Sequence, residues 1–470
     1  MIKIKQIISV IILLTAPILV SAQTLNEAKA MYKRGEYEQS KEVFRKQLKA
    51  RPNDAQLNQW YGVCLYETGE GDKAESYLQK AAKKKIQDSY LYLGKIAFDN
   101  YKFTVAKEYF GQYIEALEKN NKETSKGEYL YEKSARAESM LRRTEKVTII
   151  DSMVVAKDNF LNNYKLSHEC GSLSYYADMF KTEGEGTLYQ NQRQDKVIYA
   201  SITDSLYSIK ERNRLNDGAW SDELELNVLP DINGNIAYPF LLNDGLTLYF
   251  ATDNDSLSVG GYDIFVTRKN LNTDEYLAPN NMGMPFNSTA NDYMMVIDEY
   301  HNVGWFATDR NQPSDSIAIY MFLPATEKEI YAELEPDSII PYAQIHSITQ
   351  TWQEGADYTT LINQVNTMPE KEDKKQEASF VFIIKPGVTY TQYEQFKSSK
   401  ALELFKLSQS VEAEIEKQRQ LLRRMRNEYA SSPSKRVSLK EPILKAEDYL
   451  KTLYPQPEQY RNAARAEEVK

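Results

Sequence analysis

The chain has 470 residues and a formal net charge of −9, with 42% hydrophobic and 27% charged residues. That length suggests about two to four globular domains. The acidic balance argues against nucleic acid as a partner, because phosphate backbones are bound by basic patches. With only two cysteines in the chain, neither a disulfide-rich scaffold nor a cysteine-based zinc site is expected.

The first 22 residues predict a cleaved secretory leader. Lys3 and Lys5 form a charged start, and the apolar run over residues 7–20 is short for a membrane span. Val20-Ser21-Ala22 is a small-residue cleavage signal; the alternative is an uncleaved N-terminal anchor. The mature chain has 470 − 22 = 448 residues and a formal charge of −9 − 2 = −11. We expect no transmembrane segment in the mature chain.

A helical pattern follows the leader. Gly35 and Gly69 are 69 − 35 = 34 residues apart, and small and large apolar residues follow each of them at helical spacing. A third unit carries Tyr101 where the turn glycine is expected. The residues expected to pack between these helices are Ala28, Met31, Ser40, Phe44, Leu48, Tyr61, Gly62, Leu65, Ala74, Leu78, Ala81, Leu93, Gly94, Ala97, Ala106 and Phe110.

Residues 25–115 resemble tetratricopeptide repeats, and residues 128–143 predict a further helix that caps the array. The resemblance implies a helical solenoid whose inner groove is lined by the first helix of each pair. The partner-binding residues expected on that face are Lys29, Tyr32, Lys33, Tyr66, Lys95 and Phe98. Such a basic and aromatic groove would hold an acidic or extended peptide. The alternative is that these are ordinary solvated or packing residues.

A second repeat lies in the middle of the chain. Leu248-Tyr249-Phe250-Ala251-Thr252-Asp253 recurs as Gly304-Trp305-Phe306-Ala307-Thr308-Asp309, and the aspartates are 309 − 253 = 56 residues apart. Asp244-Gly245 before the first copy favours a tight hairpin turn. Residues 196–201 and 206–209 form a weaker copy. These copies predict antiparallel strands.

The strand repeats resemble the WD40-like, Pro-Asp type repeats of TolB-like envelope proteins. Residues 238–265 match that pattern closely and residues 293–321 match it partially, while residues 287–292 are similar to the connection between blades. The resemblance implies a β-propeller of about five or six blades at ~40 residues each. Since a propeller needs about four to eight blades, further strands are expected from residues 147–155, 330–345 and 380–384.

The C-terminal part predicts a helical hairpin. Five seam residues are spaced three and four apart, as in a short coiled coil: Ile415, Gln418, Leu422, Met425 and Tyr429. Ser438 with Glu441 predicts a capping box, and Pro442 fits the first turn of a second helix. We expect the hairpin to fold within the molecule, with self-association as the alternative.

No motif for catalysis stands out. The histidines at 168, 301 and 346 are isolated, and no Gly-x-Ser-x-Gly or phosphate-binding loop occurs. The acidic loop 253–263 could hold calcium but lacks EF-hand spacing, so a polar turn is favoured. For Cys64 and Cys170, burial as small apolar side chains is favoured over pairing. We therefore expect neither an enzyme nor a cofactor nor a metal site.

The expected organisation is a multidomain α + β chain. It comprises a signal peptide (1–22), tetratricopeptide helical repeats (23–145), a WD40-like β-propeller (146–385) and a C-terminal helical, coiled-coil-like region (386–470). The expected function is a non-catalytic scaffold that binds protein partners in an envelope complex, for outer-membrane biogenesis, secretion or gliding, or glycan uptake. The end of the leader resembles exported proteins of the Bacteroidetes group of bacteria, which implies the periplasm or the periphery of the outer membrane. The alternative is a glycan-binding or glycan-cleaving propeller.

Overall fold

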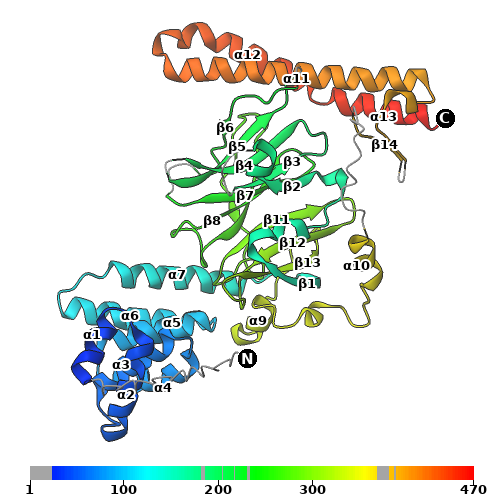
Figure 1. Ribbon diagram of the computed structural model, residues 1–470. Coiled ribbons are helices and arrows are strands. Elements are labelled where there is room, and N and C mark those ends of the chain that lie inside the picture. The colour runs from blue at the N-terminus through cyan, green and yellow to red at the C-terminus, as the bar shows by residue number, and fades with distance from the viewer. Residues whose placement is uncertain are drawn as a thin grey trace, which may run out of the picture. The chain divides into compact units, whose positions relative to one another are not determined.

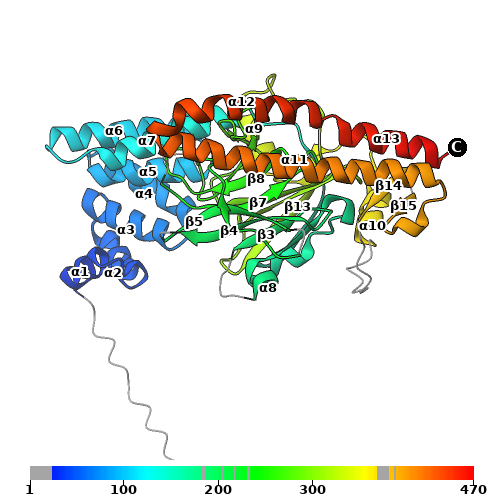
Figure 2. The same cartoon turned by 90° about the horizontal axis from the view of Figure 1, so that it is seen from above.

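The computed structural model describes residues 24–181, 186–203, 205–215, 218–229, 233–367, 380–385 and 388–470. The leader predicted over residues 1–22 lies outside them. The chain divides into two compact units. The first comprises residues up to Arg143 together with Ala332–Ile340, and the second comprises Thr144–Tyr331 together with Pro341–Lys470. Figures 1 and 2 show the elements of both units.

Helices in antiparallel pairs fill the first unit between residues 24 and 143, so the predicted helical repeats are confirmed. They are α1 (Leu25–Lys33), α2 (Tyr37–Ala50), α3 (Ala55–Glu67), α4 (Gly71–Ala82), α5 (Gln87–Asp99), α6 (Phe103–Lys119) and α7 (Ser125–Arg142). The helix expected over 128–143 is α7. All sixteen residues expected to pack between the helices are buried.

Close approach of the paired helices explains the small residues of the pattern. A Cβ added at Gly62 would lie 2.7 Å from Leu78 Cγ, and one added at Gly94 would lie 2.5 Å from Phe110 Cε1. Real Cβ atoms do not approach other atoms so closely, so the large side chain of the second helix occupies the space that the glycine leaves. Small residues facing large ones thus set the spacing within each pair.

The turns inside the three repeats share a left-handed backbone. Gly35 and Gly69 have φ angles of +81° and +79°, and Tyr101 has a φ of +60°. A tyrosine rarely adopts this conformation, which favours glycine. The side chain of Tyr101 is buried and its ring lies 5.3 Å from that of Phe103, so packing holds the third turn in place of the missing glycine.

Three antiparallel sheets form the middle of the second unit (Figure 1). The first sheet has the order β2 (Ser172–Tyr175), β3 (Thr187–Gln190), β4 (Lys196–Thr203), β5 (Leu206–Asn213) and β6 (Leu224–Glu225). The second has the order β10 (Asn280–Asn281), β9 (Asp263–Arg268), β8 (Thr247–Thr252) and β7 (Ile236–Leu241). The third has the order β1 (Thr148–Ala156), β13 (Ser316–Leu323), β12 (Val303–Thr308) and β11 (Asp292–Asp298). The first strand of the region therefore completes its last sheet.

The 56-residue repeat is visible in the backbone as well as in the sequence. Tyr238 in β7 and Met294 in β11 both have positive φ angles, +57° and +54°, and they are 294 − 238 = 56 residues apart. The strand register shifts at the same place in both copies, next to these two residues. The predicted strands of both copies, and the hairpin of the weaker copy, are confirmed.

Two expectations about further blades are wrong. Residues 330–345 contain the helix α9 (Pro336–Ala343), in which Pro336 and Asp337 suit a first helical turn. Residues 380–384 do contribute a strand, β14 (Phe382–Lys385), but among the described residues it pairs with β15 (Val388–Tyr390) and joins none of the three sheets, and its apolar side chains pack on the C-terminal helices. The strand expected over 147–155 is present as β1. The three sheets among the described residues are fewer than the roughly four blades of a closed propeller.

The C-terminal helices form the predicted hairpin. Helix α11 (Ser399–Ser431) packs against α12 (Arg436–Leu453), and α13 (Gln456–Glu468) continues from α12 back along α11 (Figure 2). Two seam residues, Ile415 and Leu422, are buried in a cluster with Ala446, Leu450 and Leu453. This arrangement confirms the helical hairpin, and the folding of the hairpin within the molecule instead of self-association stays a prediction.

The predicted capping box is wrong. A short helical turn, Pro433–Lys435, leads directly into α12, so the helix begins before the Ser438-Glu441 pair. The Ser438 hydroxyl donates to the Lys435 carbonyl instead of capping, and Pro442 lies inside the helix. The remaining helices are α8 (Tyr176–Phe180), α10 (Thr359–Asn366) and the 3-10 turns Lys157–Asn163, His168–Cys170, Ile348–Thr351 and Tyr393–Gln395.

Candidate functional site

The six predicted groove residues all lie on the first helices of the pairs. Three are on α1, Tyr66 is on α3, and Lys95 and Phe98 are on α5. Hydrogen bonds join successive first helices along this face. Gln59 Nε2 of α3 donates to the Tyr32 hydroxyl at 3.0 Å, and the Tyr66 hydroxyl donates to Asp99 Oδ2 of α5 at 2.8 Å. The contacts therefore join α1, α3 and α5 along one face, which we call the first-helix face. Phe98 packs toward the following helices instead, with its ring 5.2 Å from that of Phe103 on α6 and the Lys133 ammonium of α7 over it.

Two of the three lysines predicted for the first-helix face lie over aromatic rings. The Lys29 ammonium lies 4.8 Å from the centre of the Trp60 ring. The Lys95 ammonium lies 4.8 Å from the ring of Tyr92 and 5.4 Å from that of Tyr66. Each such contact contributes about 0.5–1 kcal/mol at an exposed site. These lysines therefore hold aromatic neighbours in position as well as supplying charge.

The first-helix face has mixed charge, although the sequence suggested a basic groove. Lys95 lies 3.7 Å from Glu67 Oε1, and the Tyr92 hydroxyl donates to the same oxygen at 2.8 Å. Sequence reasoning missed Glu67 and Asp99, which directly follow Tyr66 and Phe98. Successive residues on a helix point about 100° apart, so helix periodicity did not place these acids on the same face as the aromatic residues. Lys33 is exposed and makes no ion pair within the described ranges.

The tyrosines of this face remain neutral hydrogen-bond donors. Burial, together with the adjacent carboxylates Asp99 and Glu67, raises the pKa of Tyr66 and Tyr92 well above the ordinary value for tyrosine. Each phenol therefore keeps its proton and donates a hydrogen bond to a carboxylate. The chemistry that this face offers a partner is aromatic contact, one exposed cation at Lys33 and hydrogen-bonding carboxylates, which suits recognition of a polypeptide.

Both cysteines are buried and unpaired, as expected. Cys64 Sγ lies 3.4 Å from Ser40 Oγ, and burial raises the pKa of its thiol to about 11. Cys170 Sγ lies 3.5 Å from Asp298 Oδ1, and burial also raises the pKa of that thiol. A buried thiol with a raised pKa holds little thiolate at neutral pH, so both behave as small apolar side chains.

The aspartates of the strand repeats hold neighbouring segments together. Asp253 accepts from the backbone N–H of Asn235 at 2.6 Å and from its side-chain amide at 2.7 Å. Asp309 accepts from the same two groups of Asn291, both at 2.8 Å. The two asparagines are 291 − 235 = 56 residues apart, so this Asn–Asp clasp is part of the repeat. It was not predicted, although the period of the aspartates extends to the asparagines.

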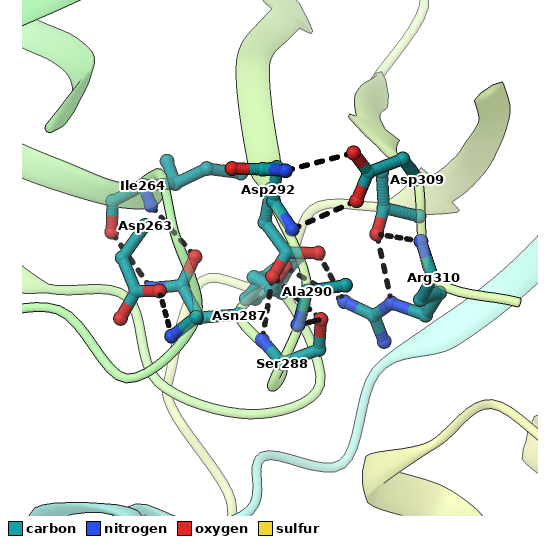
Figure 3. Close-up of polar contacts among 12 residues, drawn as sticks. Asp263, Ile264, Asn287, Ser288, Ala290, Asp292, Asp309 and Arg310 are labelled. Atoms are coloured by element: carbon teal, nitrogen blue, oxygen red, sulfur yellow. Dashed lines mark hydrogen bonds and ion pairs between the residues drawn. The ribbon is translucent and has the colours of Figure 1, made fainter. Parts of the chain in front are cut away.

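The connection between the second and third sheets is a buried polar network (Figure 3). Asn287 bonds to both backbone groups of Ile264 in β9, at 2.7 and 2.9 Å, and so acts as a strand partner. Asp292 accepts from the Ser288 hydroxyl at 2.7 Å and from Arg310 Nη2 at 2.7 Å. Asn287, Ser288, Asp292 and Arg310 are all buried. Residues 287–292 thus join the second and third sheets.

The acidic loop 253–263 uses its carboxylates in the same way. Asp253 belongs to the clasp, and Asp263 accepts from the backbone N–H groups of Val259 and Gly260 at 2.9 and 3.1 Å. These bonds are those of a polar turn, the interpretation favoured from the sequence. His301 also lies in a turn, where Asp298 accepts from its backbone N–H at 2.9 Å and from its ring nitrogen Nδ1 at 3.0 Å.

Aromatic residues in the strand-rich region are mostly core. Tyr238 stacks on Tyr293 with ring centres 4.7 Å apart, and Phe160 lies 5.7 Å from Tyr293. Tyr293 and Phe160 are 2% and 4% exposed. These rings therefore stabilise the sheets and do not form an open platform for a sugar.

Comparison with known proteins identifies one region. No curated protein matches the chain. Among the described helices, none combines the length and the apolar character that a membrane-crossing segment requires. A tetratricopeptide repeat model matches residues 25–95, which hold α1 to α4 and most of α5. The helical N-terminal region is therefore a tetratricopeptide repeat region.

Proposed function

We propose that this chain is an exported, non-catalytic scaffold that holds protein partners in a bacterial envelope complex. The observation that carries the proposal is the tetratricopeptide array with its aromatic first-helix face. Repeats of this kind suggest protein–protein interaction. The face runs without interruption over α1, α3 and α5, which gives an extended segment of a partner several contacts in line.

We also propose that the strand-rich region is a WD40-like β-propeller. Sheets of four and five antiparallel strands, the 56-residue repeat and the sheet-to-sheet connection at residues 287–292 support this interpretation. The completion of the last sheet by β1 supports it further, because pairing the first strand with the last sheet is a way to close a ring.

A binding role fits the residues of both regions better than catalysis. The polar side chains of the strand motif accept hydrogen bonds from neighbouring segments, so the repeat maintains the fold. The proposal places the protein in the periplasm or at the periphery of the outer membrane. The leader predicted over residues 1–22 supports that placement.

Affinity purification of the tagged protein from crosslinked native membranes, followed by mass spectrometry, tests the proposal. Outer-membrane barrels or secretion components should be recovered in near-equal amounts with the protein. Recovery of the protein alone would contradict the scaffold, and binding of soluble glycans would then be measured.

The first-helix face is tested in the same purification with the double variant Lys33→Glu, Phe98→Ala. Lys33 is the exposed cation, and Phe98 is half-buried with its ring 5.2 Å from that of the buried Phe103, so an unchanged melting temperature of the variant is required before partner loss is assigned to the face. Reversal at Lys95 would place two acids beside each other at Glu67, so it is a poorer choice. Lys49→Glu on α2, also exposed, is the matched control. We expect partner loss in the double variant only; equal recovery from all three proteins would contradict this role.

A further inference from the structure

A cleft of about 780 Å³ opens in the second unit. One wall is the hairpin of α11 and α12, and the other comprises residues 224–227 at β6 and residues 269–276 after β9. Its size falls within the ~300–1,000 Å³ typical of small-molecule sites.

Three arginines of α11 line one wall of the cleft: Arg419, Arg423 and Arg426. Their spacing of four and three residues puts them on one helical face. Arg426 is committed to holding the helix, because it donates to the carbonyls of Thr273 and Asn272 at 2.9 and 3.2 Å and to Glu447 at 3.0 Å. It therefore fixes the width of the cleft.

Arg423 is near two carboxylates but outside hydrogen-bonding distance of both. Its Nη2 lies 3.6 Å from Glu211 and 3.9 Å from Asp274. Each acid has a closer cation, with Lys196 Nζ 2.9 Å from Glu211 and Lys269 Nζ 2.9 Å from Asp274. The fork of Arg423 is thus oriented by charge while its donors remain available to an acceptor in the cleft.

Arg419 has a neutral neighbour. Its Nε donates to the Tyr454 hydroxyl at 3.2 Å, and its guanidinium lies 5.2 Å from the centre of that ring. Stacking on a ring holds the plane of a guanidinium and leaves its outer edge free to bind a planar anion. Two preorganised arginines one helical turn apart can bind one oxyanion between them.

The cleft also has an apolar surface. Leu271 lines it and is 47% exposed, and the half-buried Tyr276 adds a ring, while Leu422 and Leu450 lie in the core of the α11–α12 hairpin. Besides Asp274, three acidic residues line the cleft. Glu225 and Glu275 are exposed, and Glu447 forms an ion pair with Arg426. A ligand that fits these walls has one compact negative group and an apolar or planar part.

We propose that this cleft binds a small organic anion, with a carboxylate or phosphate group on Arg419 and Arg423 and an apolar part against Leu271 and Tyr276. Guanidinium forks match both oxyanions by paired hydrogen bonds. The proposal concerns a site that the scaffold function does not use.

Isothermal titration of the mature full-length chain with phenyl phosphate, benzoate and inorganic phosphate tests the proposal. At least one of the two aromatic anions should bind, and about tenfold or more tightly than inorganic phosphate. Which of the two binds tells a phosphate site from a carboxylate site. Heat from neither aromatic anion would overturn the proposal, and so would binding of phenyl phosphate no tighter than that of inorganic phosphate when both bind.

Arg423→Lys keeps the positive charge at this position but removes the planar guanidinium group. The lysine keeps a cation beside Glu211, so the fold should be retained, but it cannot make paired hydrogen bonds. We expect affinity to fall about tenfold with the melting temperature unchanged. Arg424→Gln, on an exposed neighbour that does not line the cleft, is the matched control and should bind like wild type. Equal affinity in both variants would overturn the assignment, and Arg419→Met should weaken binding independently of Glu211.

Discussion

The two repeat regions are held together by different chemistry. In the helical repeats the recurring residues are glycines and apolar side chains, such as Gly62 against Leu78. In the strand repeats the recurring residues are polar and bind neighbouring backbone, as in the clasp of Asp309 with Asn291. Helices satisfy their own backbone, so their contacts can be steric, whereas a connection between sheets must satisfy backbone groups that no strand reaches.

This difference separates motif from function in both regions. The glycines of the helical pattern set helix spacing and leave the first-helix face free to vary with the partner. The aspartates of the strand pattern are residues of a type that could bind a ligand, but their carboxylates accept hydrogen bonds from neighbouring segments of the fold. The following substitutions test that contrast, beginning with the largest expected effect.

Arg310→Met should destabilise the second unit by about 3–5 kcal/mol, because it leaves the buried carboxylate of Asp292 without its cation. Urea denaturation followed by tryptophan fluorescence in a Trp60→Phe background measures it. The three remaining tryptophans, at 220, 305 and 352, all lie in that unit. Adding Asp292→Asn should restore about 1–2 kcal/mol, since it removes the uncompensated charge.

Arg268→Met is the surface control for this comparison. Arg268 is largely exposed, with its nearest carboxylate, that of Asp244, at 4.0 Å. The change should cost less than about 0.5 kcal/mol. Equal effects at 268 and 310 would contradict the view that buried polar contacts stabilise the strand repeats.

Asp263→Asn should remove a pH dependence of the second unit. Burial and the neighbouring charge of Asp292 raise the pKa of Asp263 to about 7. Between pH 4 and 7 the folded chain therefore holds a proton that the unfolded chain releases, so the free energy of unfolding falls as pH rises, by up to about 4 kcal/mol.

The variant has no such proton, so its stability should fall less steeply than that of wild type between pH 5 and pH 8. It should be lower than wild type near pH 5 by about 1–2 kcal/mol, because the carboxyl accepts from Val259, Gly260 and Asn281. Urea denaturation at pH 5 and pH 8 in the Trp60→Phe background checks this. A slope as steep as that of wild type would contradict the raised pKa.

Much of the fold could be predicted because each pattern has a local cause. The 34-residue spacing of the turn glycines predicted the helical pairs, and the repeated aromatic-rich segments predicted the strands. The strand predicted over residues 330–345 was wrong because a short apolar stretch does not distinguish a strand from a helix that begins at Pro336. The capping box at Ser438 failed because a preceding turn started α12 early, a boundary that the pattern alone does not fix.

The candidate site could be predicted only in part. The face was located from helix periodicity, which placed Tyr66 and Phe98 on first helices. The mixed charge of the face was not predicted. Glu67 and Asp99 bind residues of another helix pair, and helix periodicity describes only residues within one helix. The clasp of Asn235 with Asp253 was missed for the same reason.

Gly94→Ala should destabilise the helical unit by about 1–3 kcal/mol, because the new Cβ would meet the rigid ring of Phe110. Hydrogen–deuterium exchange of α5 and α6 should quicken in this variant, and Phe110→Leu should relieve part of the strain. Gly111→Ala on α6 is the control, since nothing lies within 4 Å of its Cβ position. That change should slow exchange slightly, and similar exchange in both variants would contradict the steric account.

The turns give the smallest and most direct test of the helical repeat. Gly69→Ala should cost about 1 kcal/mol, because nothing lies within 4 Å of the new Cβ and only the left-handed backbone is strained. Tyr101→Gly relieves a comparable strain but removes a buried ring worth about 2–3 kcal/mol, so it should also destabilise the unit, by about 1–2 kcal/mol. Hydrogen–deuterium exchange of the α3–α4 and α5–α6 pairs measures both. A stabilised Tyr101→Gly variant would mean that the ring does not hold the third turn, and that the missing glycine is a defect that the chain merely tolerates.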